Sequence, residues 1–108
     1  MKSTLKILFA DDDFKYSLVL KRFLEREGYE VTYTGNGTMA LKQFPVVKPD
    51  LVLLDIQLPD MTGFDIADTL LARYGRDALP PMVALTANLI RDKTEYYDHG
   101  MVAVIGKP

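Results

Sequence analysis

One stretch near the middle of the chain, residues 51–63 (LVLLDIQLPDMTG), limits the fold more than any other part of the sequence. It begins with apolar residues that lead into Asp55, and a turn containing Pro59 and Gly63 follows directly. A short apolar run that ends in turn residues is typical of a buried strand in a parallel sheet. Because open α/β sheets bind their ligands at the carboxyl ends of the strands, Asp55 is placed where chemistry is expected. Asp50 precedes the same strand and should lie at the opposite edge of the sheet, roughly 16 Å away.

Outside this stretch the chain alternates between strand-like and helix-like segments. Apolar or alternating runs rich in β-branched residues predict strands, whereas apolar residues at helical spacing predict helices. Together with residues 51–55, the predicted strands cover residues 5–10, 29–34, 82–87 and 102–105. The predicted helices run from 14 to a stop at 28, from a cap at 36 or 38 to 44, from a cap at 62 to a stop at 75, and from 89 to 99.

The first helix has a clear apolar face. Tyr16, Leu20, Phe23 and Leu24 recur at helical spacing, and Asp13 is expected to cap the helix rather than to bind a metal.

Two later segments are less regular. Pro45 and Pro49 are expected to bracket a loop. Residues 89–99 are mostly polar, so their helix should be loosely anchored. The single histidine, His99, is interpreted as a surface residue, and Tyr96 and Tyr97 as packing or partner contacts.

Strands that alternate with helices indicate right-handed βαβ units and a parallel sheet with helices on both faces. The expected fold class is α/β, with a flavodoxin-like doubly wound sheet of five strands in the order 2-1-3-4-5. Such a sheet binds ligands where its order reverses, between strands one and three. Asp11, Asp12 and Asp55 stand at the ends of these two strands. The sequence therefore predicts that the three carboxylates converge.

Length and composition narrow the class of protein. A chain of 108 residues suits one domain, residues 1–108, and 48% hydrophobic residues suffice for a single core. A net charge of −2 provides no basic field for nucleic acid. No apolar run approaches the ~18 residues of a membrane span, so direct membrane contact is not expected. The lack of cysteine fits a reducing, cytoplasmic setting.

A group of carboxylates at one point requires a cation. At separations of ~5 Å, each pair repels by about 3 kcal/mol at an effective dielectric constant of 20. Oxygen ligands with few carboxylates suit Mg²⁺, for which Mn²⁺ could substitute. The absence of cysteine and of a nearby histidine argues against zinc.

A carboxylate in such a site can act as a nucleophile and form an aspartyl phosphate. Phosphoryl transfer also requires groups that stabilise charge on the phosphoryl oxygens. Thr86 offers a hydroxyl together with backbone donors around Ala87, and Lys107 offers an ammonium at the end of the last strand. These groups, each at the end of a different strand, would form one site with Asp55.

Four motifs then carry a family resemblance: ILFADDD, LVLLDIQLPDMTG, VALTAN and GKP. In this order they resemble the receiver (CheY-like) domain of two-component signalling, over essentially the whole chain. The stretches LVLLDIQLPDMTGFDI and LPPMVALTAN are especially similar to the receivers of hybrid sensor histidine kinases of the anoxic redox control type.

The resemblance implies a role for each acidic residue. Asp55 would be the phosphoacceptor. Asp12 and Asp55 would bind Mg²⁺ directly, together with the backbone carbonyl of Gln57, and Asp11 would act through a water molecule.

The resemblance also assigns the remaining groups of the site. Thr86 and Lys107 would hold the phosphoryl oxygens, beside the backbone of Ala87. The Lys107–Pro108 peptide bond is expected to be cis, as in the family.

The implied function is a step in a phosphorelay. The domain would take a phosphoryl group from a phosphohistidine onto Asp55, catalysing its own modification without being a stand-alone enzyme. It would then pass the group to a histidine phosphotransfer domain, as part of a hybrid sensor histidine kinase on the cytoplasmic side of the inner membrane. A stand-alone response regulator and a pseudo-receiver that only docks partners stay open as alternatives.

Two features depart from the family pattern, and two other functions are disfavoured. Val104 stands where the family has an aromatic switch residue, and a fifth helix normally follows Pro108, so one sheet face is expected to lack cover.

A phosphohydrolase with an Asp-x-Asp motif is disfavoured by Lys15, where a Thr or Val is expected. A flavin site is disfavoured by the acidic first loop.

Overall fold

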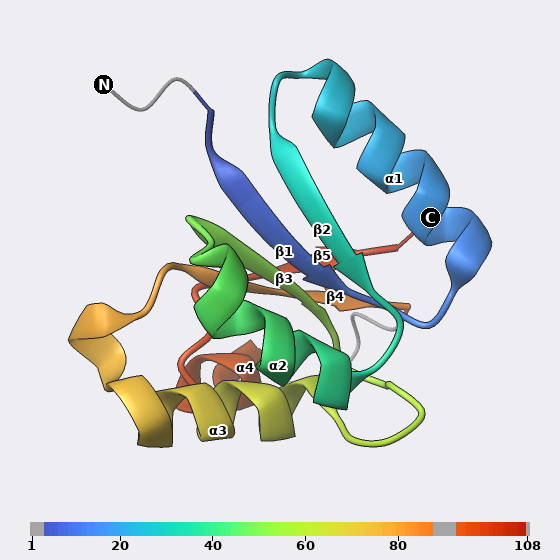
Figure 1. The fold of residues 1–108 in the computed structure, drawn as a ribbon. Helices are drawn as coiled ribbons and strands as arrows, with labels where there is room; N and C mark the ends of the chain where they lie inside the picture. The colour runs from blue at the N-terminus through green and yellow to red at the C-terminus, as the bar shows by residue number, and fades with distance from the viewer. Residues whose placement is uncertain (1–3, 88–92, 108) are drawn as a thin grey trace.

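The centre of the computed structural model, which describes residues 4–87 and 93–107, is a parallel sheet of five strands (Figure 1). Its order, β2-β1-β3-β4-β5, confirms the predicted flavodoxin-like topology. The strands are β1 (Lys6–Ala10), β2 (Glu30–Thr34), β3 (Leu51–Asp55), β4 (Met82–Thr86) and β5 (Ala103–Gly106). The helices are α1 (Phe14–Arg26), α2 (Gly37–Val47), α3 (Gly63–Tyr74) and α4 (Lys93–Asp98), with a 3₁₀ helix η1 (Arg76–Ala78) before β4.

Helices cover both faces of the sheet. In Figure 1, α1 lies on one face, while α2, α3 and α4 lie on the other. Accordingly β1, β3 and β4 are buried nearly throughout, as expected of strands covered on both sides. The edge strands β2 and β5 are only partly buried. Among the described residues, no helix combines the length and the apolar character that spanning a bilayer demands.

Helix α1 begins as predicted, but its apolar face differs from the expectation. Asp13 caps the helix by accepting a hydrogen bond from the N–H of Tyr16 at 3.1 Å. Leu20 and Leu24 pack against the core beneath α1. Phe23 is 56% exposed, which makes its assignment to the buried face wrong.

Helix α2 is longer than predicted. Asn36 caps its start by accepting a hydrogen bond from the N–H of Met39 at 2.8 Å. The helix then continues through Pro45 to Val47, so the expected loop at Pro45 is wrong. Pro45 lies in the last turn of α2. Proline has no N–H to donate, so one helical hydrogen bond is lost there, but only two helical residues follow it. The left-handed residue Lys48 ends the helix.

Helix α3 is set tightly against the strand that carries Asp55. Its start is the predicted Thr62 cap, which forms a reciprocal capping box with Asp65. Gly63 follows, and a Cβ atom at this position would lie 2.6 Å from the carbonyl oxygen of Asp55. Glycine therefore permits the close approach of α3 to the end of β3. Gly75 ends the helix as predicted, with a φ of 82°.

Helix α4 is anchored more firmly than its polar sequence indicated. Tyr96 is 1% exposed and its ring centroid lies 5.3 Å from that of Phe64 in α3. The burial of Tyr96 confirms its predicted packing role. The expectation that α4 is loosely anchored is wrong, because this one buried ring holds the helix against α3 although its other residues show little apolar periodicity. The partly buried His99 stacks on Phe64 and pairs with Asp68 at 2.7 Å. The first residues of the predicted helix, 89–92, lie outside the described residues.

The last strand is open on the α1 side. Ile105 is 49% exposed, and no helix among the described residues covers its side chain. Val104 points the other way and packs against the core on the side of α2, α3 and α4.

Candidate functional site

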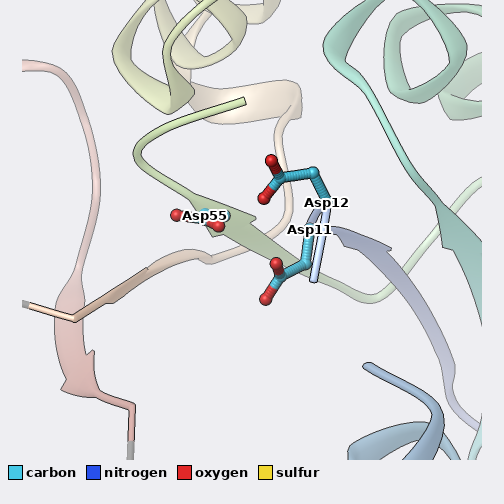
Figure 2. Close-up of side chains that lie close together, drawn as sticks. All are labelled: Asp11, Asp12 and Asp55. Atoms are coloured by element: carbon cyan, nitrogen blue, oxygen red, sulfur yellow. The ribbon is translucent and has the colours of Figure 1, made fainter. Parts of the chain in front are cut away.

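Three carboxylates meet at the carboxyl edge of the sheet. Figure 2 shows Asp11 and Asp12 at the end of β1 close to Asp55 at the end of β3. Each offers an oxygen that lies within 4.8 Å of those of the other two. Asp11 and Asp55 are buried, at 0% and 6% exposure, whereas Asp12 is exposed. The predicted convergence is confirmed, and the cluster opens to solvent at Asp12.

The sequence brings these residues together because the strand pairing is parallel and in register. Ala10 pairs with Leu54, so the residue after each of them, Asp11 and Asp55, lies at the same edge of the sheet. Asp50 lies at the opposite edge, where its carboxylate accepts a hydrogen bond from the N–H of Lys6 at 2.8 Å. This contact agrees with the prediction that Asp50 takes no part in the site.

One oxygen of each buried carboxylate is held by the local backbone. Asp11 Oδ1 accepts a hydrogen bond from the N–H of Asp13 at 2.8 Å, and Asp55 Oδ1 accepts one from the N–H of Gln57 at 3.0 Å. Tyr33 fixes the Asp11 backbone, because its hydroxyl donates to the Asp11 carbonyl at 2.6 Å. The second oxygen of each carboxylate is left to face its neighbours.

Lys107 lies between these second oxygens. Its Nζ donates a hydrogen bond to Asp55 Oδ2 at 2.8 Å and also lies 2.8 Å from Asp11 Oδ2. The contact with Asp11 is an ion pair, and Asp11 Oδ2 is buried with Lys107 as its charged neighbour. The N–H of Lys107 donates to the carbonyl of Thr86 at 2.8 Å, which fixes the chain after β5.

Burial and mutual charge shift the ionisation of the cluster. Burial, with the charge of Asp55 adding to it, raises the pKa of the Asp11 carboxyl, although Lys107 and the N–H of Asp13 act in the opposite direction. Burial works to lower the pKa of Lys107, but the carboxylates of Asp11 and Asp55 together outweigh it and raise that pKa. The ammonium therefore stays charged, and Asp11 carries an electrostatic cost that a further cation would reduce.

Three further predicted site residues, Thr86, Ala87 and Gln57, lie at or just after the carboxyl ends of β4 and β3. Thr86 ends β4, is 8% exposed, and follows the residue that pairs with Asp55 in the sheet register. Ala87 comes next and is exposed. Gln57 is exposed in the loop of residues 56–62 after β3. Pro108, and with it the expected cis bond, lies outside the described residues.

Two aromatic contacts of the site were not predicted. The ring of Tyr16 lies beside Lys107, with 5.2 Å between Nζ and the ring centroid. The sequence pattern indicates only a strand at Tyr33, whereas its hydroxyl donates to the carbonyl of Asp11. A signal for Tyr16 was present, since the residue lies in the first turn of the helix that follows the acidic pair.

A further contact ties the loop after β3 to helix α2. The Asp60 carboxylate accepts hydrogen bonds from the N–H groups of Gly37 and Thr38, both at 2.8 Å, and from the Thr38 hydroxyl at 2.6 Å. The Thr38 hydroxyl and these backbone donors lower the pKa of Asp60 from 3.8 to about 2. A Cβ atom on Gly37 would overlap the Met61 side chain, so the loop and the helix fit closely.

Comparison with known proteins assigns the chain to a family. Residues 7–108 match the model of the response regulator receiver domain, and the chain therefore belongs to that family. It is a receiver domain of two-component signalling with the CheY-like version of the flavodoxin-like fold.

Individual relatives are of more than one kind. The chain is 48% identical over 104 residues to the aerobic respiration control sensor protein ArcB of Escherichia coli strain K12, covering 96% of this chain and 13% of ArcB. It is 42% identical over 82 residues to the DNA-binding response regulator MtrA of Mycobacterium tuberculosis strain H37Rv, covering 76% of this chain and 34% of MtrA. The chain thus spans a minor part of the length of both relatives, and the resemblance to a sensor kinase of the ArcB type is confirmed.

A solved structure agrees with these relatives. The response regulator TrrA of Thermotoga maritima, crystallised in complex with Mg²⁺-BeF, superposes with a TM-score of 0.83 at 30% identity. The superposition covers 96% of this chain and 87% of TrrA.

The contact of Asp60 with α2 predicts a specific pH dependence. A carboxyl whose pKa is lowered on folding stabilises the fold above its ordinary pKa, and this contribution is lost as the pH falls through the folded value. The wild type should therefore be more stable than Asp60→Asn at pH 4, and the gap should narrow as the pH falls through about 2. Thermal unfolding followed by circular dichroism at pH 4, 3 and 2 measures the gap. A gap that stays constant over this range would contradict the assignment.

Proposed function

We propose that this receiver domain accepts a phosphoryl group on Asp55 from a phosphohistidine, in a reaction that requires Mg²⁺. The observation that carries the proposal is the cluster itself. Asp11, Asp12 and Asp55 offer oxygens within 4.8 Å of one another, and the Lys107 ammonium lies 2.8 Å from two of these side chains. This combination of oxygen ligands and one cationic side chain suits a metal-assisted phosphoryl transfer.

The residues present fit a magnesium ion. All donors are oxygens, and among the described residues the buried Asp11 Oδ2 forms an ion pair with Lys107 but no hydrogen bond. Asp12 and Asp55 would hold the ion directly with the backbone carbonyl of Gln57, and Asp11 would act through water; Mn²⁺ could substitute. When bound, the ion supplies positive charge that neutralises the carboxylates and attracts a phosphorylated donor. TrrA, a similar protein solved with Mg²⁺-BeF, supports this assignment.

In the proposed reaction Asp55 is the nucleophile, and the neighbouring groups stabilise the phosphoryl oxygens. A carboxylate oxygen of Asp55 attacks phosphorus, and the new O–P bond forms as the P–N bond to the donor imidazole breaks, with the electron pair leaving on nitrogen. The Lys107 ammonium and the Thr86 hydroxyl would contact the phosphoryl oxygens, beside the backbone N–H of Ala87. Lys107 already lies against Asp55, so its charge requires little rearrangement to stabilise the transferring group.

The proposed partners are a histidine kinase and a histidine phosphotransfer domain. The match to ArcB covers more of this chain at higher identity than the match to MtrA, and this favours a relay role within a hybrid sensor kinase, on the cytoplasmic side of the membrane. Helix α1 and the loops after β1, β3 and β5 surround the site and would form the docking surface. A stand-alone regulator is the second candidate, favoured by the similarity to MtrA.

Replacing the proposed phosphoacceptor should abolish phosphorylation. Asp55→Asn should take up no label from radioactive acetyl phosphate with Mg²⁺, because an amide oxygen is a poor nucleophile, while the wild type is labelled. Asp50→Asn is the matched control, since it removes a carboxylate from the opposite edge of the sheet, and it should be labelled like the wild type. Label that survives alkali, or equal labelling of Asp55→Asn, would contradict the proposal, and an unlabelled wild type would favour a pseudo-receiver.

The magnesium assignment makes a separate prediction. Asp11→Asn should weaken Mg²⁺ binding by about tenfold or more, measured by isothermal titration calorimetry, because it removes a supporting negative charge from the site. Asp13→Asn removes the same charge two residues away but keeps a side chain that can cap α1, and should change the affinity little. Equal effects of the two variants would show a general charge effect instead of a defined site.

The relay role requires onward transfer. The chain labelled on Asp55 should pass its phosphoryl group to an isolated histidine phosphotransfer domain of an ArcB-type kinase within minutes, detected by gel autoradiography. A phosphotransfer domain whose histidine is changed to glutamine should take up nothing. Loss of label to free phosphate alone would contradict the relay and favour the stand-alone regulator.

A further inference from the structure

Lys107 has a third neighbour besides its two carboxylates. Its ammonium lies 2.8 Å from Asp11 and from Asp55, and 5.2 Å from the centroid of the Tyr16 ring. An ammonium within about 6 Å of the centroid of an aromatic ring is attracted by the negative electrostatic potential of the ring face. The Lys107 side chain is only 12% exposed, so this attraction acts in a partly desolvated place.

The position of Tyr16 is itself fixed by the fold. The residue lies in the first turn of α1, and its N–H donates to the capping carboxylate of Asp13 at 3.1 Å. Its side chain packs against the buried residues beneath α1. The ring is therefore held on α1 while the ammonium comes from the opposite end of the chain, beyond β5.

The electrostatics of the site keep the ring neutral. Burial raises the pKa of the Tyr16 hydroxyl, and the nearby carboxylates add to the rise while Lys107 opposes it. The phenol consequently stays protonated at neutral pH, and its ring face, rather than a phenolate, is what Lys107 meets.

We propose that Tyr16 is a positioning residue for Lys107, holding the ammonium at Asp55 through the face of its ring. A lysine side chain has several rotatable bonds and loses much conformational freedom when it is held in one place. A rigid ring beside the ammonium reduces the number of positions that it can take. The inference rests on the proposed function, because it assigns Tyr16 to the group that stabilises the transferring phosphoryl oxygens.

Two substitutions separate the ring from the hydroxyl and from simple packing. Tyr16→Phe keeps the ring face and should be labelled by acetyl phosphate at close to the wild-type rate. Tyr16→Leu keeps an apolar side chain for packing but removes the ring, and its labelling rate at saturating Mg²⁺ should fall about three- to tenfold. The Mg²⁺ affinity of Tyr16→Leu should not weaken, because all the proposed metal ligands remain.

A spectroscopic measurement tests the contact itself. In the wild type and in Tyr16→Phe, the ring current should shift the NMR signals of the Lys107 Cε protons away from those of an unstructured lysine. In Tyr16→Leu these signals should return toward that reference, while circular dichroism shows the fold retained. A labelled wild type with Tyr16→Leu labelled equally fast, or Lys107 signals unchanged in that variant, would overturn the positioning role alone. A wild type that takes no label would overturn the proposed function and the inference with it.

Discussion

The accumulation of negative charge at one edge of the sheet is the constraint on which the site depends. Two buried carboxylates at ~5 Å repel by about 3 kcal/mol at an effective dielectric constant of 20. Lys107 offsets this cost by lying 2.8 Å from both Asp11 and Asp55. Asp11 and Lys107 follow β1 and β5, and Asp55 ends β3. The balance of charge therefore requires the whole strand order, and an error in topology would leave the acids without their counter-ion.

The sequence was sufficient to predict this convergence. Parallel strands end at a common edge, so residues that follow apolar runs meet there whatever the details of the helices between them. Asp11, Asp12 and Asp55 could be found in this way, as could the caps at Asp13 and Thr62, because each depends on residues close to it in sequence.

The features that sequence patterns missed depend on contacts between distant residues. The exposure of Phe23 depends on which side of α1 faces the sheet, and the anchoring of α4 depends on one ring packing against α3. The ring of Tyr16 has the spacing of a core residue, and its position beside Lys107 depends on a contact across nearly the whole chain. None of these partners is encoded in local periodicity.

The contact of Asp60 with α2 has a mechanical consequence. A shift of the loop that follows Asp55 would break three hydrogen bonds between Asp60 and the first turn of α2, and Met61 fills the space against Gly37. Helix α2 in turn packs on β1 and on α3. The loop that carries Asp60 therefore links the strand that ends in Asp55 to α2 by direct contacts, and α2 contacts β1, which leads to Asp11 and Asp12.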